Sequence, residues 1–577
     1  MKRWLNYAKP YWPYFIIGPL CMIVEVIGEI ALPALYAKIV DVGIETQNVG
    51  YIAVVCGLMI LTAALMMSGG VGGAFFAAKA SVNVAADVRR DVYAKIQRFS
   101  FANIDHFSTG SLVTRLTNDV TQVMNMINML MRMCLRAPGM LIGALIMAIT
   151  MNPSLATVLA VTIPILIVII VIVIRIGFPR FSRMQSKVDA LNNKIQEDLT
   201  NVRVIKSFVR EDYEKERFAE ANGDLKSTTM QALNVMIAMM PTMMLLMNFT
   251  TLAVIWFGGN QVIAGTMPVG NLTAFINYVT QILMSLMMLT MVFMNSSRAL
   301  ASARRISEVL DEKIDLTDEN ARHRDLDVVN GKVEFRNVSF RYYKNSDEKV
   351  LNSVSLTIEP GETVGIIGST GCGKTTLVSM IPRLYDADEG EVLVDGVNVR
   401  DYDLTRLRNG VGMVLQKNVL FSGTIEENLR WGDENASMEQ VTAAAQNAQA
   451  DGFVRSFPEG YDTVLDQGGA NVSGGQKQRL CIARALLKKP KILILDDSTS
   501  AVDTATEARI RATFRNELTE STKIVIAQRI SSVMDADKII VLDDGCVTGV
   551  GTHDELLASN QEYQEIYYSQ MDRKEGA

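Results

Sequence analysis

Histidine and cysteine are scarce in this chain of 577 residues, and neither residue type clusters. The three histidines, His106, His323 and His553, stand apart from one another, so we assign none a catalytic role. The six cysteines form no Cys-x-x-Cys pair and have no histidine at metal-ligand spacing. The sequence therefore predicts neither a zinc site nor disulfide bonds, and a reducing cytosol suits every cysteine.

An excess of positive charge is also lacking, since the formal net charge is −6. The overall charge therefore gives no sign of nucleic-acid binding. No cleavable signal peptide is evident, and residues 1–14 are instead basic and aromatic, which predicts a short helix at the membrane surface. Hydrophobic residues make up 49% of the chain and the mean hydropathy is +0.18, which is high for a soluble protein.

The first half contains six apolar runs, each close to or above the roughly 20 residues that span a bilayer as a helix. Their cores are 14–36, 51–78, 126–150, 154–178, 235–258 and 268–294. Short connections without Lys or Arg alternate with long ones, around 79–120 and 175–230, that are rich in both. The positive-inside rule then places both termini and the long segments in the cytosol. A buried helix bundle in a soluble protein is the alternative, and the charge alternation disfavours it.

The composition changes after these runs. We expect a six-helix transmembrane domain over 1–310 and a charged, broken linker over 311–330. From 331 to 577 the pattern becomes alternating strands and then strand–helix units, which predicts an α/β nucleotide-binding domain.

A glycine-rich loop lies between a predicted strand, 363–367, and a predicted helix near 377–381. Its residues are Gly368, Ser369, Thr370, Gly371, Cys372, Gly373, Lys374, Thr375 and Thr376. This order of strand, glycine loop, Lys-Thr and helix is typical of a phosphate-binding P-loop. Backbone N–H groups would surround the phosphates, Lys374 would reach the β- and γ-phosphates, and Thr375 would hold Mg²⁺. A chance glycine turn is the alternative, and the flanking elements disfavour it.

Two further motifs in the second half suit a nucleotide. Asp496 follows the apolar run 492–495, so a buried parallel strand would carry its carboxylate to the Mg²⁺. Ser473, Gly474, Gly475 and Gln476 precede a helical run over 477–489. Amides and the serine hydroxyl at such a helix N-terminus can bind a phosphate. The simplest use of a second phosphate-binding end is to close on the nucleotide of another subunit.

These ordered motifs resemble those of the ATP-binding cassette family, and the six preceding helices resemble its half-transporter exporters. The resemblance covers nearly the whole chain. It implies ATP and Mg²⁺ as cofactors, with two cassettes sandwiching two ATP molecules between the P-loop of one and the signature of the other. Tyr342 matches the aromatic residue that stacks on adenine, and Gln416 matches the glutamine that senses Mg²⁺. Residues 473–476 match the family signature, and Asp503 matches the loop that couples the two sites.

The chain departs from the family pattern at catalytic positions. Asp497 stands where the family usually has Glu, and its side chain is one methylene shorter. Gln528 stands where a histidine usually contacts the γ-phosphate, and an amide cannot carry the imidazolium charge. Gln467 likewise replaces a common Glu. We therefore predict a degenerate ATP site in one half of a heterodimer, resembling bacterial multidrug exporters. Neutral drift in a homodimer that still hydrolyses ATP is the alternative.

Two segments match the elements that connect membrane helices to cassettes in this family. The first is 108–119 and the second is 204–212. The resemblance implies that the second docks on the partner's cassette, with Phe208 as the apolar knob and Arg210 and Glu211 in its polar rim. Ordinary exposed turns in long helices are the alternative.

Methionine is abundant, with 32 residues, and is patterned in the membrane runs. One helical face carries Met236, Met239, Met240, Met243, Met244 and Met247, and another carries Met284, Met287, Met288 and Met291. Such a flexible, polarizable surface suits varied lipophilic substrates, although plain helix packing or lipid contact is the alternative.

An intramembrane acid, Glu25, either pairs with Arg136 or selects cationic substrates. We thus predict a candidate substrate cavity that includes Glu25, Met287 and Met291.

The function we expect is ATP-driven export of small lipophilic compounds across the cytoplasmic membrane. The chain would be a multi-pass subunit with a second half-transporter as partner and lipid as its surroundings. A homodimeric lipid or peptide exporter and an ATP-gated regulatory subunit are the alternatives.

Overall fold

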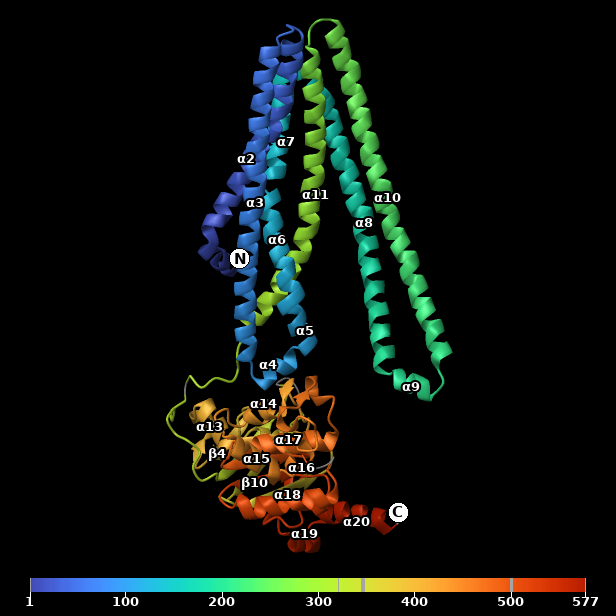
Figure 1. The fold of residues 1–577 in the computed structure, drawn as a ribbon. Coiled ribbons are helices and arrows are strands. Elements are labelled where there is room, and N and C mark those ends of the chain that lie inside the picture. Colours follow the sequence, from blue (N-terminus) through green and yellow to red (C-terminus); the bar gives the residue numbers. More distant parts are fainter. Residues whose placement is uncertain (1, 320, 344–347, 499–501, 576–577) are drawn as a thin grey trace. The chain divides into compact units, whose positions relative to one another are not determined.

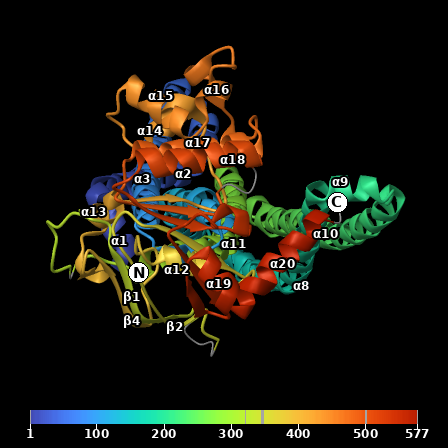
Figure 2. The same ribbon diagram turned by 90° about the horizontal axis from the view of Figure 1, so that it is seen from below.

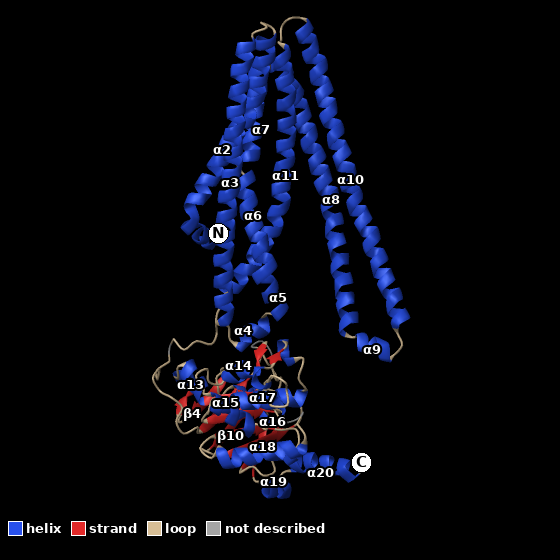
Figure 3. Ribbon diagram, viewed as in Figure 1, coloured by secondary structure: helices blue, strands red, loops and turns tan. Residues whose placement is uncertain are grey.

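The computed structural model describes residues 2–319, 321–343, 348–498 and 502–575 (Figure 1). The chain divides into two compact units. The first contains 1–97 and 109–311, and the second contains 98–108 and 312–577. All strands of the described residues lie in the second unit, and the first is helical (Figure 3).

The first unit is built from long helices that are joined by short connections. They are α1 (Lys2–Ala8), α2 (Trp12–Lys38), α3 (Val49–Gln97), α5 (Thr109–Thr114), α6 (Val120–Met133), α7 (Arg136–Met151), α8 (Pro153–Thr200), α9 (Val202–Ser207), α10 (Glu211–Ile263) and α11 (Val269–Asp311). Two π-helical segments, η2 (Ile39–Ile44) and η3 (Arg115–Asp119), continue α2 and join α5 to α6. Tyr7 and Tyr11 donate hydrogen bonds to Asp91 and Asp87, which fixes α1 along α3.

Within the described residues, six helical stretches are long and apolar enough to cross a membrane. They are Arg3–Ile44, Val49–Gln97, Thr109–Met151, Pro153–Thr200, Glu211–Ile263 and Val269–Thr290. Each contains or overlaps one of the apolar runs in the sequence, so the prediction of six spans is confirmed. The stretches exceed the about 20 residues that a bilayer requires, as expected for helices that continue beyond it.

Helices α8 and α10 pack along each other and are joined by α9, away from the remaining helices of the first unit over much of their length (Figure 1). Apolar side chains on this hairpin are exposed, including Val168 at 56% and Phe178 at 72%. Lipid or a partner subunit can cover such a surface, whereas water covers it at a free-energy cost.

The described residues of the second unit form three sheets. The largest has the order β12-β11-β3-β10-β9-β6, in which β11, β3, β10, β9 and β6 are parallel and β12 is antiparallel. An antiparallel sheet has the order β2-β1-β4-β5, and β7 pairs with β8. The strands are β1 (Val333–Phe340), β2 (Leu351–Ile358), β3 (Thr363–Gly368), β4 (Glu389–Val394), β5 (Val397–Asn398), β6 (Val411–Val414), β7 (Gly423–Thr424), β8 (Val464–Leu465), β9 (Ile492–Asp496), β10 (Thr522–Ile526), β11 (Lys538–Asp543) and β12 (Cys546–Gly551).

The helices of the second unit are α4 (Phe101–His106), α12 (Lys374–Ser379), α13 (Leu404–Gly410), α14 (Ile425–Arg430), α15 (Met438–Asn447), α16 (Asp451–Val454), α17 (Gly474–Leu487), α18 (Thr504–Glu517), α19 (His553–Ser559) and α20 (Gln561–Glu575). Some of these helices cover the parallel sheet, and others, including α14, α15 and α17, pack against one another. All five residues of β9 are buried, as their continuous apolar run predicts for a strand covered on both faces. The α/β fold that was predicted for this half is therefore confirmed.

Candidate nucleotide site

The candidate site lies at the carboxyl edge of the parallel sheet. Strand β10 lies between β3 and β9, and β6 lies on the far side of β9. The P-loop follows β3, and Gln528 follows β10. Asp496 ends β9 and Asp497 comes directly after it, while Gln416 follows β6. Because the carboxyl ends of neighbouring parallel strands meet at one edge, residues as far apart in the sequence as Gly368 and Gln528 come together there.

The P-loop has the backbone that its glycines permit. Gly368 has φ +154°, and a Cβ there would lie 1.9 Å from the Leu542 carbonyl oxygen. Gly373, at φ +96°, is the N-cap residue of α12. Lys374 Nζ donates to the carbonyl oxygens of Gly368 at 2.8 Å and Ser369 at 2.7 Å. The loop therefore holds the lysine over the same backbone that would surround a phosphate.

Asp496 and Thr375 form a donor set that fits Mg²⁺. Thr375 Oγ1 donates to Asp496 Oδ1 at 3.1 Å, while the buried Asp496 Oδ2 has no hydrogen-bond partner. Burial raises the pKa of the Asp496 carboxyl. An unpartnered buried carboxylate oxygen is costly unless a cation or a proton satisfies it. Mg²⁺ is commonly held by one or two carboxylates together with substrate phosphates, and here Thr375 and Asp496 would be its ligands from the chain.

Asp497 lies beside both amide side chains of the site. Gln528 Nε2 donates to Asp497 Oδ2 at 2.8 Å, and the Gln416 side chain also hydrogen-bonds this carboxylate. Burial raises the pKa of Asp497, although these two hydrogen bonds oppose the rise. Its φ of +47° lies in the left-handed region, which Asp tolerates better than most residues. The structure thus places Asp497, Gln528 and Gln416 together.

Tyr342 contacts the C-terminal end of the P-loop. Its hydroxyl is 2.8 Å from Thr376 Oγ1, and its ring meets the Tyr385 ring at 5.3 Å and 89°. The side chain is 44% exposed, so part of its ring remains open for stacking. Tyr385 is not predictable from the sequence as a neighbour of this site, because no local pattern distinguishes it from an ordinary core tyrosine.

The signature residues begin α17. Ser473 Oγ accepts from the Gln476 backbone N–H at 3.3 Å, and Gln476 Oε1 accepts from the Ser473 N–H at 2.9 Å. This capping box satisfies the helix end and leaves the serine O–H free of any role in the box. Ser473 and Gly474 are exposed. Helix α17 packs with α14 and α15, and Figure 2 shows it apart from α12, which follows the P-loop.

Asp503 is the N-cap residue of α18 and accepts from the Thr506 N–H at 2.9 Å. Hydrogen bonding to this backbone N–H lowers the pKa of Asp503. The preceding residues, 499–501, lie outside the described part of the chain.

Residues 98–108 belong to the second unit although they follow a membrane helix. Ser100 caps α4 in a capping box with Asn103, and Asn103 Nδ2 donates to the Lys313 carbonyl oxygen at 3.0 Å. Tyr385 Oη donates to Asp105 Oδ2 at 2.9 Å. Tyr385, whose ring meets that of Tyr342, is thus bonded to a segment that immediately precedes 108–119.

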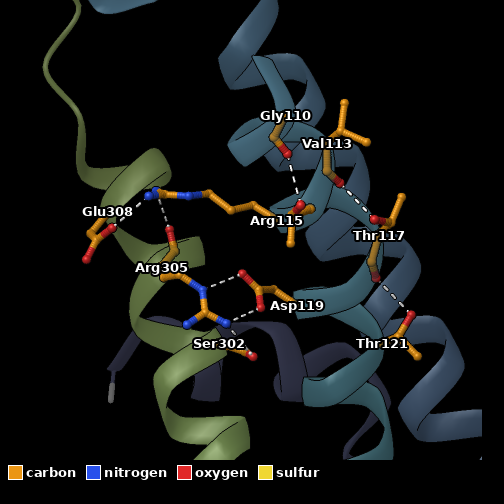
Figure 4. Close-up of polar contacts among 10 residues, drawn as sticks. Gly110, Val113, Arg115, Thr117, Asp119, Thr121, Ser302, Arg305 and Glu308 are labelled. Carbon is orange, nitrogen blue, oxygen red and sulfur yellow. Dashed lines mark hydrogen bonds and ion pairs between the residues drawn. The ribbon is translucent and has the colours of Figure 1, made fainter. Parts of the chain in front are cut away.

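Residues 109–119 contact α11 instead, within the first unit (Figure 4). Arg115 Nη1 donates to the Arg305 carbonyl oxygen at 2.8 Å, and Arg115 pairs with Glu308 at 3.0 Å. Arg305 forms a bidentate contact with Asp119, which is 2% exposed. This network ties η3 to α11 near the point where α11 leads into the second unit.

The second predicted coupling segment forms the tip of the α8–α10 hairpin. Phe208 is 73% exposed and Val209 is 81% exposed, with φ +52° at Val209. Glu211 pairs with Lys206 at 2.8 Å, and Arg210 lies over the Tyr213 ring at 5.7 Å. The charged side chains Arg210 and Glu211 thus make contacts within the hairpin, while the apolar side chain of Phe208 is exposed.

The predicted intramembrane pair is present in the first unit. Arg136 Nη2 lies 3.2 Å from Glu25 and 3.4 Å from Glu29, so one guanidinium serves two carboxylates. Gln281 Nε2 donates to the Glu29 carbonyl oxygen at 3.0 Å. Glu25 is therefore not an unpaired acid. Met287 is half-buried, and the side chain of Met291 lies outside the described residues.

Comparisons with known proteins agree with this plan. Residues 15–286 match the ABC transporter transmembrane region, and residues 351–500 match the ABC transporter domain. The uncharacterized ABC transporter ATP-binding protein YfiB of Bacillus subtilis is 42% identical over 574 residues, covering 100% of this chain and 99% of YfiB. The putative multidrug export ATP-binding/permease protein YgaD of the same organism is 35% identical, covering 98% of each chain. The ATP-dependent lipid A-core flippase of Syntrophus aciditrophicus is 31% identical, covering 99% of this chain and 94% of the flippase.

A solved structure of a bacterial Atm1-family ABC exporter with ATP bound is similar throughout. It has a TM-score of 0.78 and 28% sequence identity, covering 96% of this chain and 98% of that chain. The chain therefore belongs to the ABC transporters and is an ABC exporter, with a transmembrane region and an ABC ATPase domain.

Proposed function

We propose that this chain is one half of a heterodimeric exporter, in which its own ATP site binds MgATP but hydrolyses it slowly or not at all. The observation that carries this proposal is the contact between Gln528 and Asp497, at 2.8 Å. Both residues stand where the family resemblance implies a histidine and a glutamate.

The chemistry of the pair supports slow hydrolysis. A general base has to reach the attacking water within hydrogen-bond distance, and small displacements of it are costly in rate. Asp497 is one methylene shorter than Glu, and its carboxylate is engaged by two amides. Gln528 can hydrogen-bond a γ-phosphate but cannot supply an imidazolium charge. The binding residues, Lys374 and Thr375, are present.

A second subunit is needed to complete either nucleotide site. The exposed N-terminus of α17 lies apart from α12 in this chain, so its natural use is to close on a partner's ATP. The exposed apolar flank of α8 and the exposed Phe208 at the hairpin tip suit burial against a partner as well. ABC exporters work as dimers, and two P-loops with two signatures make two composite sites.

The signature of this chain would then serve a partner that retains the catalytic Glu and His. ATP binding closes such a sandwich because ATP has higher affinity for the closed state, and this difference shifts the membrane helices from inward- to outward-facing. In this chain α4 would respond to nucleotide binding, because Tyr385 hydrogen-bonds Asp105 of α4 and its ring packs against the Tyr342 ring. Both termini and the ATPase domain would lie in the cytosol.

Small lipophilic compounds are the substrates we propose. YgaD carries a putative multidrug export name, and half-buried methionines such as Met287 suit varied apolar ligands. A homodimeric lipid exporter is the second candidate, because another relative is named as a lipid A-core flippase. ATP-dependent uptake of a lipophilic dye into inverted vesicles, compared with flipping of a labelled lipid, separates the two.

The proposal is tested with the full chain, purified alone in lipid nanodiscs. We expect MgATP binding with little turnover, and no further loss of turnover in Asp497→Asn. A Lys374→Ala variant, which should lose binding, is the control for a folded but empty site. Brisk turnover that Asp497→Asn abolishes would contradict the proposal.

A further inference from the structure

The C-terminal helix α20 packs on the parallel sheet through one face. Tyr563, Ile566, Tyr567 and Gln570 have the spacing i, i+3, i+4 and i+7, which places them on the same side of the helix. Tyr563 is fully buried, and Ile566 and Tyr567 pack against a cluster that includes Ile530. Gln570 therefore continues this face of α20 and places an amide side chain beside its aromatic and aliphatic ones.

The Gln570 amide group makes two hydrogen bonds with the segment after β10. Its Nε2 donates to the Gln528 carbonyl oxygen at 2.8 Å, and its Oε1 accepts from the Ile530 N–H at 3.0 Å. A planar amide that bonds both a C=O and an N–H fixes the orientation of the intervening backbone as well as its position. The side chain of Gln528 leaves this same backbone to reach Asp497.

Helix α18 holds the next two residues from the other direction. Ser532 Oγ donates to Glu507 at 2.6 Å, and Arg511 Nη1 donates to the Ser531 carbonyl oxygen at 2.5 Å. The segment 528–532 is thus fixed by α20 at its start and by α18 at its end.

We propose that Gln570 is a positioning residue of the nucleotide site, which holds the backbone of 528–530 so that the Gln528 amide stays directed at Asp497 and the γ-phosphate. This inference rests on the proposed role of Gln528 at the chain's own ATP site. In this proposal the C-terminal helix contributes to the response to ATP. Displacement of α20 would release the Gln528 side chain and leave the P-loop unchanged.

The hydrogen-bond clamp is tested first without nucleotide. We compare Gln570→Met with Gln564→Met in the full chain, because Gln564 lies on the same helix but donates to the Leu557 carbonyl oxygen of α19 at 2.8 Å. Hydrogen exchange followed by mass spectrometry should show amide exchange around Ile530 accelerated about tenfold in Gln570→Met, since losing one hydrogen bond changes an opening equilibrium by about that factor. Gln564→Met should leave this segment unchanged. Equal exchange around Ile530 in both variants would overturn the inference.

The positioning role is tested through the preference for ATP over ADP. This preference is measured with Mg²⁺ as the Kd for ADP divided by the Kd for ATP. Gln528→Ala and Gln570→Met should each lower this ratio by about three- to tenfold, and the double variant should lower it no further. Gln564→Met should keep the wild-type ratio, whereas a merely structural role would weaken both nucleotides equally. A Gln570→Met ratio equal to wild type, beside a lowered Gln528→Ala ratio, would overturn the inference. If Gln528→Ala itself keeps the ratio, the proposed role of Gln528 fails, and the exchange experiment still decides whether Gln570 holds the segment.

Discussion

Gln528 donates a hydrogen bond from its side-chain amide to the Asp497 carboxylate, with 2.8 Å between Nε2 and Oδ2. The two residues follow the ends of neighbouring strands, and the Asp497 backbone N–H also donates to the Ile526 carbonyl oxygen at 3.0 Å. The pair is therefore held by the sheet itself. Exchanging both side chains should alter the chemistry of the site without altering its frame.

In the exporter assembled with its partner, the double variant Asp497→Glu with Gln528→His should raise ATP turnover at this chain's own site by at least about tenfold, because a well-placed general base contributes about 10²–10⁴-fold. Steady-state phosphate release in lipid nanodiscs measures this. Adding Lys374→Ala to the same background should abolish the gain. No gain in turnover, with binding intact, would show that the two positions do not limit hydrolysis.

The Tyr385 hydroxyl should matter for communication between α4 and the nucleotide more than for ATP binding. Tyr385→Phe keeps the rings in contact but loses the hydrogen bond to Asp105, so we expect unchanged MgATP affinity, weaker stimulation of the assembled exporter by substrate, and a stability loss of about 1 kcal/mol. Tyr461→Phe is the matched control, because Tyr461 donates to Asp451 at 2.7 Å in the same unit. The idea fails if both variants reduce stimulation equally.

Asp496 should destabilise the nucleotide-free protein at neutral pH. Burial raises the pKa of this carboxyl, so the protonated form is favoured in the folded state. Its contribution to stability is fully present below the ordinary pKa, about 3.9, and is lost as the pH rises through the raised value. Asp496→Asn should therefore melt higher than wild type without Mg²⁺ and nucleotide, and the difference should widen as the pH rises above the ordinary pKa of an aspartate. A wild-type protein that is the more stable one at pH 8 would contradict this.

Arg136 should be far less replaceable than either acid beside it. Arg136→Met leaves Glu25 and Glu29 without their cation and should cost about 3 kcal/mol or more, whereas Glu25→Gln leaves a matched Arg136–Glu29 pair and should cost less than about 1 kcal/mol. Thermal inactivation in detergent, followed by size-exclusion chromatography, compares them. Similar losses in both variants would show that the cluster is not held by its charge pairing.

The motifs at the carboxyl edge of the sheet could be predicted from the sequence because each is local. A glycine loop after a strand, or an acid at the end of an apolar run, identifies itself within ten residues, as Lys374 and Asp496 do. The six membrane spans were predictable for the same reason, since length and apolar composition suffice.

Contacts between distant parts of the chain could not be predicted in this way. Asp105 meets Tyr385 across 280 positions, and Gln570 meets Gln528 across 42, with no periodic pattern that relates the partners. The pairing of Glu25 with Arg136 could be inferred from membrane depth, but the sharing of that arginine with Glu29 depends on helix packing. Such contacts follow from the tertiary fold, which brings the elements together.

The subunit composition of the working exporter tests the central claim most directly. Two copies of the gene, each carrying a different affinity tag, are expressed in the native host, and the complex is purified from its membranes through the first tag. The account predicts that the second tag is absent and that an equal amount of another half-transporter is present, with Glu and His at the positions of Asp497 and Gln528. Recovery of both tags in one complex that hydrolyses ATP at a normal rate would contradict it.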